Sequence, residues 1–447
     1  MDSPTFSNET FENVKCITIH ILVDGNIVLP DETESNTNAA LFVEKLNQLF
    51  PNASVCQLEN NGSYSQETQV VLNGQDQLIA SLLVSRKEIS YRLFGCDLAL
   101  DNLPAITNLT AITYYECNDS DLFRQLIRIN SSSLIKLYVE FKDQYLFKSL
   151  VIDSDEASIQ YPNLKKLILW YHGLRHTGPR LQLEGVPFPA LTSLEIAELG
   201  CIGNDILFRG NSQTLEYIRA LFLVNDYSSI PFNEGNAQLT FPKAKQLIID
   251  LYYIGEAAVP EHEHSITWFA TDSAPNVQYL KLVPAYSLNK DILITKLCSS
   301  SAARHLVCLE ICQLDLSMLE IIDILKHTPS LICLLLQLPE LKYTLDCEQA
   351  SNNLAELRKM HNIPNSKLST FVIETSSDQK RTIHLGLILG LLCPSLSVVK
   401  WGSSPVFFEP AYNLVSNLPV YNKHKKRLQE IEWEEWDRSS MTWAYPE

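Results

Sequence analysis

A short pattern of apolar and variable positions recurs along the chain. It consists of an apolar residue, two variable residues, Leu or another apolar residue, one variable residue and a further apolar residue. Clear copies read LKKLIL at 164–169, LTSLEI at 191–196, VQYLKL at 277–282 and LVCLEI at 306–311. The second half of each copy alternates apolar and variable residues, which is the period of a β-strand with one buried face. Each copy therefore predicts a short strand.

The copies are regularly spaced along the sequence. From residue 134 onward their first residues stand on average about 29 residues apart, and earlier copies begin at 14, 53 and 109. The gap from 53 to 109 spans two such steps, so we expect a degenerate copy near 88–93. The later copies begin at 134, 164, 191, 215, 244, 277, 306, 331, 368, 396 and 428. Self-similarity with this period predicts a solenoid of about 14 to 15 stacked repeats.

The segments between the copies predict helices or irregular arms. Residues 41–50, 121–129 and 316–325 place apolar side chains at helical spacing. Proline often stands two residues before a copy and would end the preceding helix in an extended conformation. These prolines are Pro51, Pro162, Pro189, Pro242, Pro275, Pro329 and Pro394. Each repeat is thus predicted as a helix or arm, a proline stop and a strand.

These phrases resemble a known repeat family. FPNAS, YPNLKKL, FPALTSL, FPKAKQL and APNVQYL are similar to fungal leucine-rich-repeat proteins of the F-box-associated, ribonuclease-inhibitor-like kind. The resemblance implies an α/β solenoid with a curved parallel sheet on the concave side and helices and irregular arms on the convex side. The F-box itself is not recognisable in this sequence. We expect a tail at 1–13, a single solenoid at 14–433 and a cap or tail at 434–447. Within the solenoid, 14–130 is expected to be more irregular than 131–433.

The variable strand positions define a candidate binding face. Strand alternation directs them outward onto the concave side of the sheet. They combine charges of both signs with Tyr and Trp, a composition typical of protein recognition. The candidates are Lys136, Tyr138, Lys166, Trp170, Glu195, Tyr279, Lys281 and Glu310. For any one of these residues, the favoured interpretation is an ordinary exposed strand residue. For the face as a whole, binding is the favoured interpretation.

The function predicted from this reasoning is a non-catalytic scaffold that binds a protein partner. The resemblance adds substrate recognition related to F-box adaptors of ubiquitin ligases, with ligase components among the partners. The alternative is a repeat protein that regulates an enzyme, such as a GTPase activator presenting Arg175 or Arg180 on a loop. A hydrolase built on unrecognised motifs is a third class.

No motif in the sequence points to an enzyme, a metal or a cofactor. GxSxG, HExxH and a glycine-rich phosphate loop are absent. Glu261 to His264 reads EHEH, but its histidines lack zincin spacing, so we expect a solvated loop after Pro260. Cys308 and Cys312 lie on one predicted strand face and are interpreted as core or concave-face thiols.

Composition limits the classes of partner and the cellular compartments that we expect. The formal charge of −17 argues against nucleic-acid backbone and anionic membranes, which attract basic patches. With 46% hydrophobic residues the chain can form a large core. There is no recognisable signal peptide, no apolar run long enough to span a membrane, and an odd number of cysteines, 11, without CxxC spacing. We expect a monomer with reduced thiols in the cytoplasm or nucleus.

Overall fold

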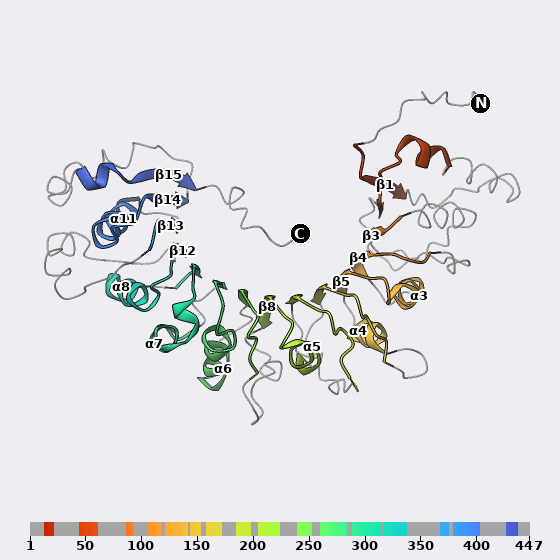
Figure 1. Cartoon of the computed structure of the whole chain (residues 1–447), viewed down its shortest axis with the longest axis horizontal. Helices are drawn as coiled ribbons and strands as arrows, with labels where there is room; N and C mark the ends of the chain where they lie inside the picture. The colour runs from red at the N-terminus through yellow and green to blue at the C-terminus, as the bar shows by residue number, and fades with distance from the viewer. Residues whose placement is uncertain are drawn as a thin grey trace, which may run out of the picture. The chain divides into compact units, whose positions relative to one another are not determined.

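The computed structural model describes sixteen stretches of the chain, which fall into two compact units, Met1–Thr214 and Leu215–Glu447 (Figure 1). The stretches are 13–21, 44–60, 86–92, 106–117, 121–141, 144–152, 158–171, 185–197, 204–223, 239–252, 260–283, 288–314, 316–337, 367–374, 379–402 and 426–436.

The first unit is built on a parallel sheet whose strands follow one another in chain order. Its described strands are β1 (Cys16–Ile21), β2 (Val55–Asn60), β3 (Glu88–Arg92), β4 (Ala111–Cys117), β5 (Lys136–Phe141), β6 (Lys166–Tyr171) and β7 (Ser193–Ala197). Helices α3 (Asp121–Asn130), α4 (Gln144–Val151) and α5 (Asn204–Asn211) belong to the same unit, as does a short helical segment at 44–49.

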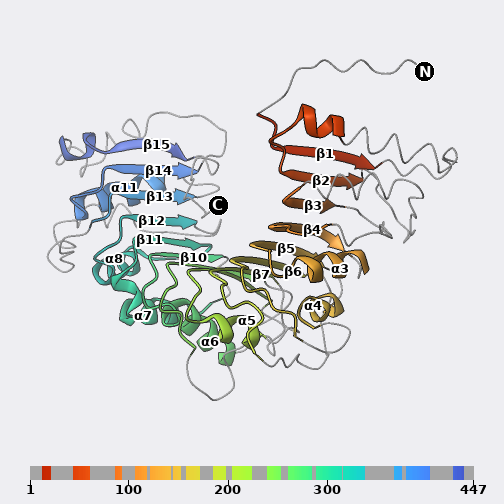
Figure 2. The same cartoon turned by 45° about the vertical axis from the view of Figure 1, so that its right-hand side comes forward.

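The second unit repeats this arrangement (Figure 2). Its described strands are β8 (Tyr217–Leu223), β9 (Gln246–Tyr252), β10 (Tyr279–Val283), β11 (Cys308–Cys312), β12 (Cys333–Gln337), β13 (Thr370–Glu374), β14 (Val398–Gly402) and β15 (Glu432–Trp436), again parallel and in chain order. The helices are α6 (Pro260–Thr271), α7 (Lys290–Ser299), α8 (Met318–His327) and α11 (Gln379–Leu392), with a 3-10 turn, η4 (Ala302–Arg304), before β11.

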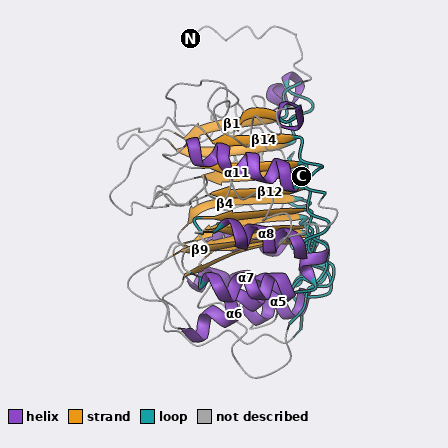
Figure 3. Cartoon of the chain, turned by 90° about the vertical axis from the view of Figure 1, so that its left-hand side faces the viewer, coloured by secondary structure: helices purple, strands orange, loops and turns teal. Residues whose placement is uncertain are grey.

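The core of each unit lies between the sheet and its helices. The repeated apolar positions supply it: Leu134, Leu137 and Val139 of one repeat are at most 1% exposed, and the neighbouring repeats place equivalent residues beside them. In the second unit, Leu309 and Ile311 do the same. In Figure 3 helices α8 and α11 of the second unit lie in front of its strands. Burial of one such leucine contributes about 1.5–3 kcal/mol, and stacking makes this burial continuous because a single repeat has no second layer of its own.

Helix ends in this fold are set by short polar signals. Helix α8 begins at a capping box, in which Ser317 Oγ accepts from the Glu320 N–H at 3.3 Å and the Ser317 N–H donates to Glu320 Oε2 at 2.6 Å. It ends at Thr328, whose Oγ1 donates to the carbonyl of Ile324 at 2.8 Å, and Pro329 follows. The chain then turns directly into Leu331 and β12. The predicted sequence of helix, proline stop and strand is confirmed in this repeat.

One buried asparagine links two consecutive repeats. Asn130, at the end of α3, donates to the carbonyls of Leu126 and Ile106 at 2.8 and 2.9 Å. Its Oδ1 accepts from the Leu109 N–H at 2.9 Å. The side chain is fully buried, so these bonds satisfy backbone groups that no water reaches. Polar residues at helix ends therefore help to hold adjacent repeats in place.

The predicted α/β class, with a parallel sheet and helices on one side, is confirmed in both units. The expected degenerate repeat near 88–93 is strand β3, where Ile89 pairs in register with Cys56 and Ile112. The domain boundaries predicted at 13, 130 and 433 stay predictions. Residues 1–12 of the predicted tail and residues 437–447 of the predicted cap lie outside the described stretches.

Two local predictions are wrong. The copy at 428–433 would align Ile431 with Val399, but the register pairs Val399 with Trp433, since a helical turn at 426–429 delays β15. Ile431 instead lies close to Gly390 of α11, where a Cβ atom would collide with it. The segment from Glu261 to His264 is the first turn of α6 rather than a loop. Pro260 is tolerated at the first helical position, where no intrahelical partner for an N–H is needed.

Candidate protein-binding face

The side of each sheet opposite its helices is called the open face here. Strand register sorts its residues into rows that cross the strands. The central row of the first unit contains Thr18, Gln57, Ser90, Thr113, Tyr138, Ile168 and Glu195. The central row of the second unit contains Arg219, Ile248, Lys281, Glu310, Leu335, Val372, Lys400 and Glu434.

All eight predicted site residues have the register of the open face, but they belong to different units. Lys136, Tyr138, Lys166, Trp170 and Glu195 lie on β5 to β7 of the first unit. Tyr279, Lys281 and Glu310 lie on β10 and β11 of the second. Period-2 alternation was sufficient to find the face of each residue, whereas its contacts depend on the neighbouring strand.

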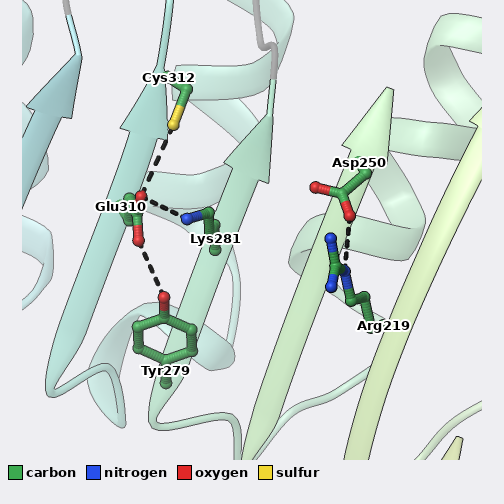
Figure 4. Close-up of polar contacts among 6 residues, drawn as sticks. All are labelled: Arg219, Asp250, Tyr279, Lys281, Glu310 and Cys312. Atoms are coloured by element: carbon green, nitrogen blue, oxygen red, sulfur yellow. Dashed lines mark hydrogen bonds and ion pairs between the residues drawn. The ribbon is translucent and has the colours of Figure 1, made fainter. Parts of the chain in front are cut away.

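In the second unit, the three predicted residues bind one another (Figure 4). Lys281 Nζ lies 2.6 Å from Glu310 Oε1, and the Tyr279 hydroxyl donates to Glu310 Oε2 at 2.9 Å. Cys312 Sγ lies 3.7 Å from Glu310 Oε1. Glu310 is only 8% exposed. The register places Lys281 directly opposite Glu310, so the contacts follow from strand pairing and satisfy both charges.

Other charges on this open face are also paired across strands. Arg219 Nε of β8 lies 2.7 Å from Asp250 Oδ2 of β9. Lys400 Nζ of β14 lies 2.7 Å from Glu434 Oε2 of β15. The hydrogen bond from Lys400 lowers the pKa of the Glu434 carboxyl. The open-face cations of the second unit are therefore largely neutralised by the protein itself.

An apolar cluster separates these pairs. Cys308, Cys333, Leu335 and Val372 have open-face register, yet they are only 3, 2, 1 and 0% exposed, and Tyr279 packs against them. Sequence reasoning missed Leu335 and Val372 as members of this face. The signal was present in LICLLL at 331–336, because an uninterrupted apolar run is typical of a strand buried on both faces.

Cys308 of this cluster and Cys312 at the end of the same strand are weak nucleophiles. The hydrogen bond with Cys333 and then burial raise the pKa of Cys308. Burial, followed by the Glu310 carboxylate, raises the pKa of Cys312 to about 12. Both thiols therefore stay protonated at neutral pH, and thiolate is the reactive form. The sequence left open whether these cysteines lie in the core or on the concave face. They have the register of the open face and are nevertheless buried.

The first unit presents a different arrangement. The Tyr138 hydroxyl donates to Glu140 Oε2 at 3.1 Å, and its ring packs against Tyr115 with centroids 4.9 Å apart. Burial, then the Glu140 carboxylate, raises the pKa of Tyr138. Trp170 is half-buried on β6. Sequence reasoning did not include Tyr115, although alternation would have found it, because it stands two residues after Thr113 of the central row.

Lys136 and Lys166, the two predicted lysines of the first unit, are poorly neutralised. Lys166 Nζ lies 3.9 Å from Glu195 Oε1, at the limit of an ion pair. Lys136 is exposed and forms no ion pair with any residue in the described stretches. The register places Lys136 directly opposite Lys166, so two like charges face each other. This arrangement is the reverse of the Lys281–Glu310 pairing.

The remaining candidates contribute no site. Arg175, Arg180, His172 and His176 lie outside the described residues. Within the described stretches, no three His, Cys, Asp or Glu side chains converge as metal ligands would. Nor does any helix there combine the length and apolar character needed to cross a bilayer.

Comparison with known proteins assigns no family to this chain. No protein-family model matches the chain, and no curated protein matches it significantly.

Proposed function

We propose that the chain is a non-catalytic scaffold that binds a protein partner on the open face of its first unit. The observation that carries the proposal is the accessible group of Lys136, Tyr138, Lys166 and Trp170 on adjacent strands. Aromatic side chains beside charges that lack close partners are the composition of energetic centres in protein interfaces. The second unit supports the proposal less, because Tyr279, Lys281 and Glu310 are engaged with one another.

Site-specific photo-crosslinking tests this proposal. A photoreactive amino acid replaces Trp170, and a matched variant carries it at Leu319, which is 50% exposed on helix α8. In extracts of the source organism we expect a discrete protein adduct at position 170 and none at 319. Equal adducts at both positions, or none at 170, would contradict binding on this face.

The identity of the partner is a finer proposal. The resemblance to F-box-associated repeats favours a link to ubiquitin ligation, and mass spectrometry of the adduct would support it by identifying a ligase subunit or substrate. Recovery of a small GTPase would favour the alternative, a GTPase regulator, whose candidate residues Arg175 and Arg180 would then be replaced individually.

A further inference from the structure

The strand starts of the first unit are basic. Lys15, Lys87 and Lys165 stand immediately before β1, β3 and β6, and Lys136 and Lys166 are the first residues of β5 and β6. These five lysines are called the basic edge. At the same two positions of the seven strands, Glu88 is the one acid. In a chain of net charge −17 this is a local excess of positive charge.

The basic edge is held on rigid backbone. The carbonyls of Lys15, Lys87 and Lys165 accept from the N–H groups of Val55, Thr110 and Thr192 on the next repeat, at 3.1, 2.7 and 3.0 Å. Lys15, Lys87, Lys136 and Lys165 are exposed, and the Lys166 side chain is 28% exposed. Fixed backbone with free ammonium groups is a preorganised surface, which reduces the entropy lost on binding.

Charge neutralisation is incomplete along this edge. In the described part of the chain its closest carboxylate contact is the 3.9 Å separation between Lys166 and Glu195. Lys136 and Lys166 lie directly opposite each other, which is destabilising unless an anion binds between them. The second unit has no such edge, because Lys245 is its one cation at the same two positions of the described strands, beside Glu216 and Glu432.

Strand spacing defines the geometry of a complementary ligand. Neighbouring strands lie about 4.8 Å apart, so lysines on β1, β3 and β5 recur about every 10 Å. An extended peptide advances about 3.3 Å per residue, so acidic residues at every third position would match this repeat. A uniformly charged polyphosphate fits less well, since the carboxylates of Glu88 and Glu140 lie on the same strands and that of Glu195 lies on the neighbouring strand β7.

We infer that the basic edge docks an extended acidic segment of the protein partner, with carboxylates at about every third residue. This inference rests on the proposed function and names the chemistry of the partner. Lys136 and Lys166 form its centre, because they combine the like-charge pairing with direct proximity to Tyr138 on β5.

Fluorescence anisotropy with the full chain tests the inference. The probes are a labelled 12-residue peptide with Glu at every third position, the same peptide with Gln, and a 12-nucleotide uridine RNA. We expect saturable binding of the Glu peptide that weakens between about 50 and 200 mM salt, because this range shortens the screening length. The double variant Lys136→Gln/Lys166→Gln should weaken it about tenfold, at about threefold per lysine. The matched control Lys245→Gln should change affinity less than twofold.

The outcomes separate the inference from the proposed function. Equal affinity for the Glu and Gln peptides, or an equal loss in the Lys245→Gln control, overturns the basic edge as a docking site. Tighter binding of the RNA with the same dependence on Lys136 and Lys166 overturns the peptide in favour of nucleic acid. Absence of peptide binding, together with a retained protein adduct at position 170, overturns the inference and leaves the proposed function standing. Circular dichroism of each variant confirms that the fold is intact.

Discussion

The two units place similar side chains on equivalent rows and use them differently. In the second unit, Lys281 stands opposite Glu310, and their atoms meet at 2.6 Å. In the first, Lys136 stands opposite Lys166, and the nearest ion pair is 3.9 Å long. An outward-facing charged residue is therefore a binding candidate only when no residue of opposite charge on a neighbouring strand pairs closely with it. In the second unit these charges hold neighbouring strands together, whereas Lys136 and Lys166 of the first unit remain available for a partner.

The cysteines give the sharpest contrast at one position of the strand. Cys16, Cys308 and Cys333 are each the first residue of a strand, but Cys16 is exposed and the other two are buried. We expect N-ethylmaleimide to label Cys16 at least about 100-fold faster, because the buried thiols need local opening before they react. Site-resolved mass spectrometry of a labelling time course measures the ratio. In denaturant the three should react alike, and similar rates under native conditions would show that the second unit's open face is accessible.

Removal of one lysine from each unit tests the pairing directly. Lys281→Met leaves the buried Glu310 carboxylate without its cation and should lower the free energy of unfolding by about 2 kcal/mol. Lys166→Met removes a long contact and a like-charge repulsion, so its effect should stay within about 0.5 kcal/mol. Urea unfolding followed by circular dichroism gives both values. Equal losses would refute the difference between the close pairing of Lys281 and the weak pairing of Lys166.

The tyrosine hydroxyls give a smaller contrast. Tyr279→Phe removes a bond to the buried Glu310 and should cost about 1.5 kcal/mol. Tyr138→Phe removes a bond to the more accessible Glu140 and should cost about 0.5 kcal/mol, since water replaces the lost donor. The same urea experiment applies. A larger cost for Tyr138 would assign it a structural role and weaken its place in the binding face.

A pH series extends the comparison to the helical side of the second unit. Burial opposes ionisation of Glu320, but the bonds from Ser317 and the Lys290 ammonium, 3.0 Å away, lower its pKa overall. A folded pKa below the unfolded one stabilises the protein above the unfolded value, and this stabilisation is lost as pH falls through the folded pKa. Glu320→Gln should therefore cost about 0.5–1 kcal/mol at pH 7. The difference from wild type should shrink below about pH 4.5, the ordinary value for Glu. A constant difference down to low pH would exclude the carboxylate as its source.

Much of the fold was predictable because its information is local. Every described strand apart from β15 begins within two residues of the first residue of its copy, and even the degenerate strand β3 was located by spacing alone. Helices α3 and α8 coincide with predicted helical runs because their apolar periodicity and end signals lie within the segment. The error at Pro260 came from applying a general stop signal where proline begins a helix.

The candidate site was only partly predictable. The outward direction of Lys281 and Lys136 follows from alternation within one strand, and the prediction treated the two lysines alike. Their different surroundings depend on which residue of the next repeat stands opposite, some 30 residues away in the sequence. The burial of Val372 depends likewise on long-range packing. The apolar run in the preceding strand, β12, nevertheless indicated that this part of the sheet is buried on both faces.

By itself, the amino-acid sequence determined the repeat, the parallel α/β class and the direction in which each strand residue points, because these depend on short periodic spacing. Tertiary structure decided which outward residues are satisfied. Strand register brings Glu310 to Lys281 but Lys166 to Lys136, and a one-residue slip of either strand would alter such a pairing. Electrostatic contacts act over a few ångströms, so the availability of a side chain for binding is a property of its neighbours in space.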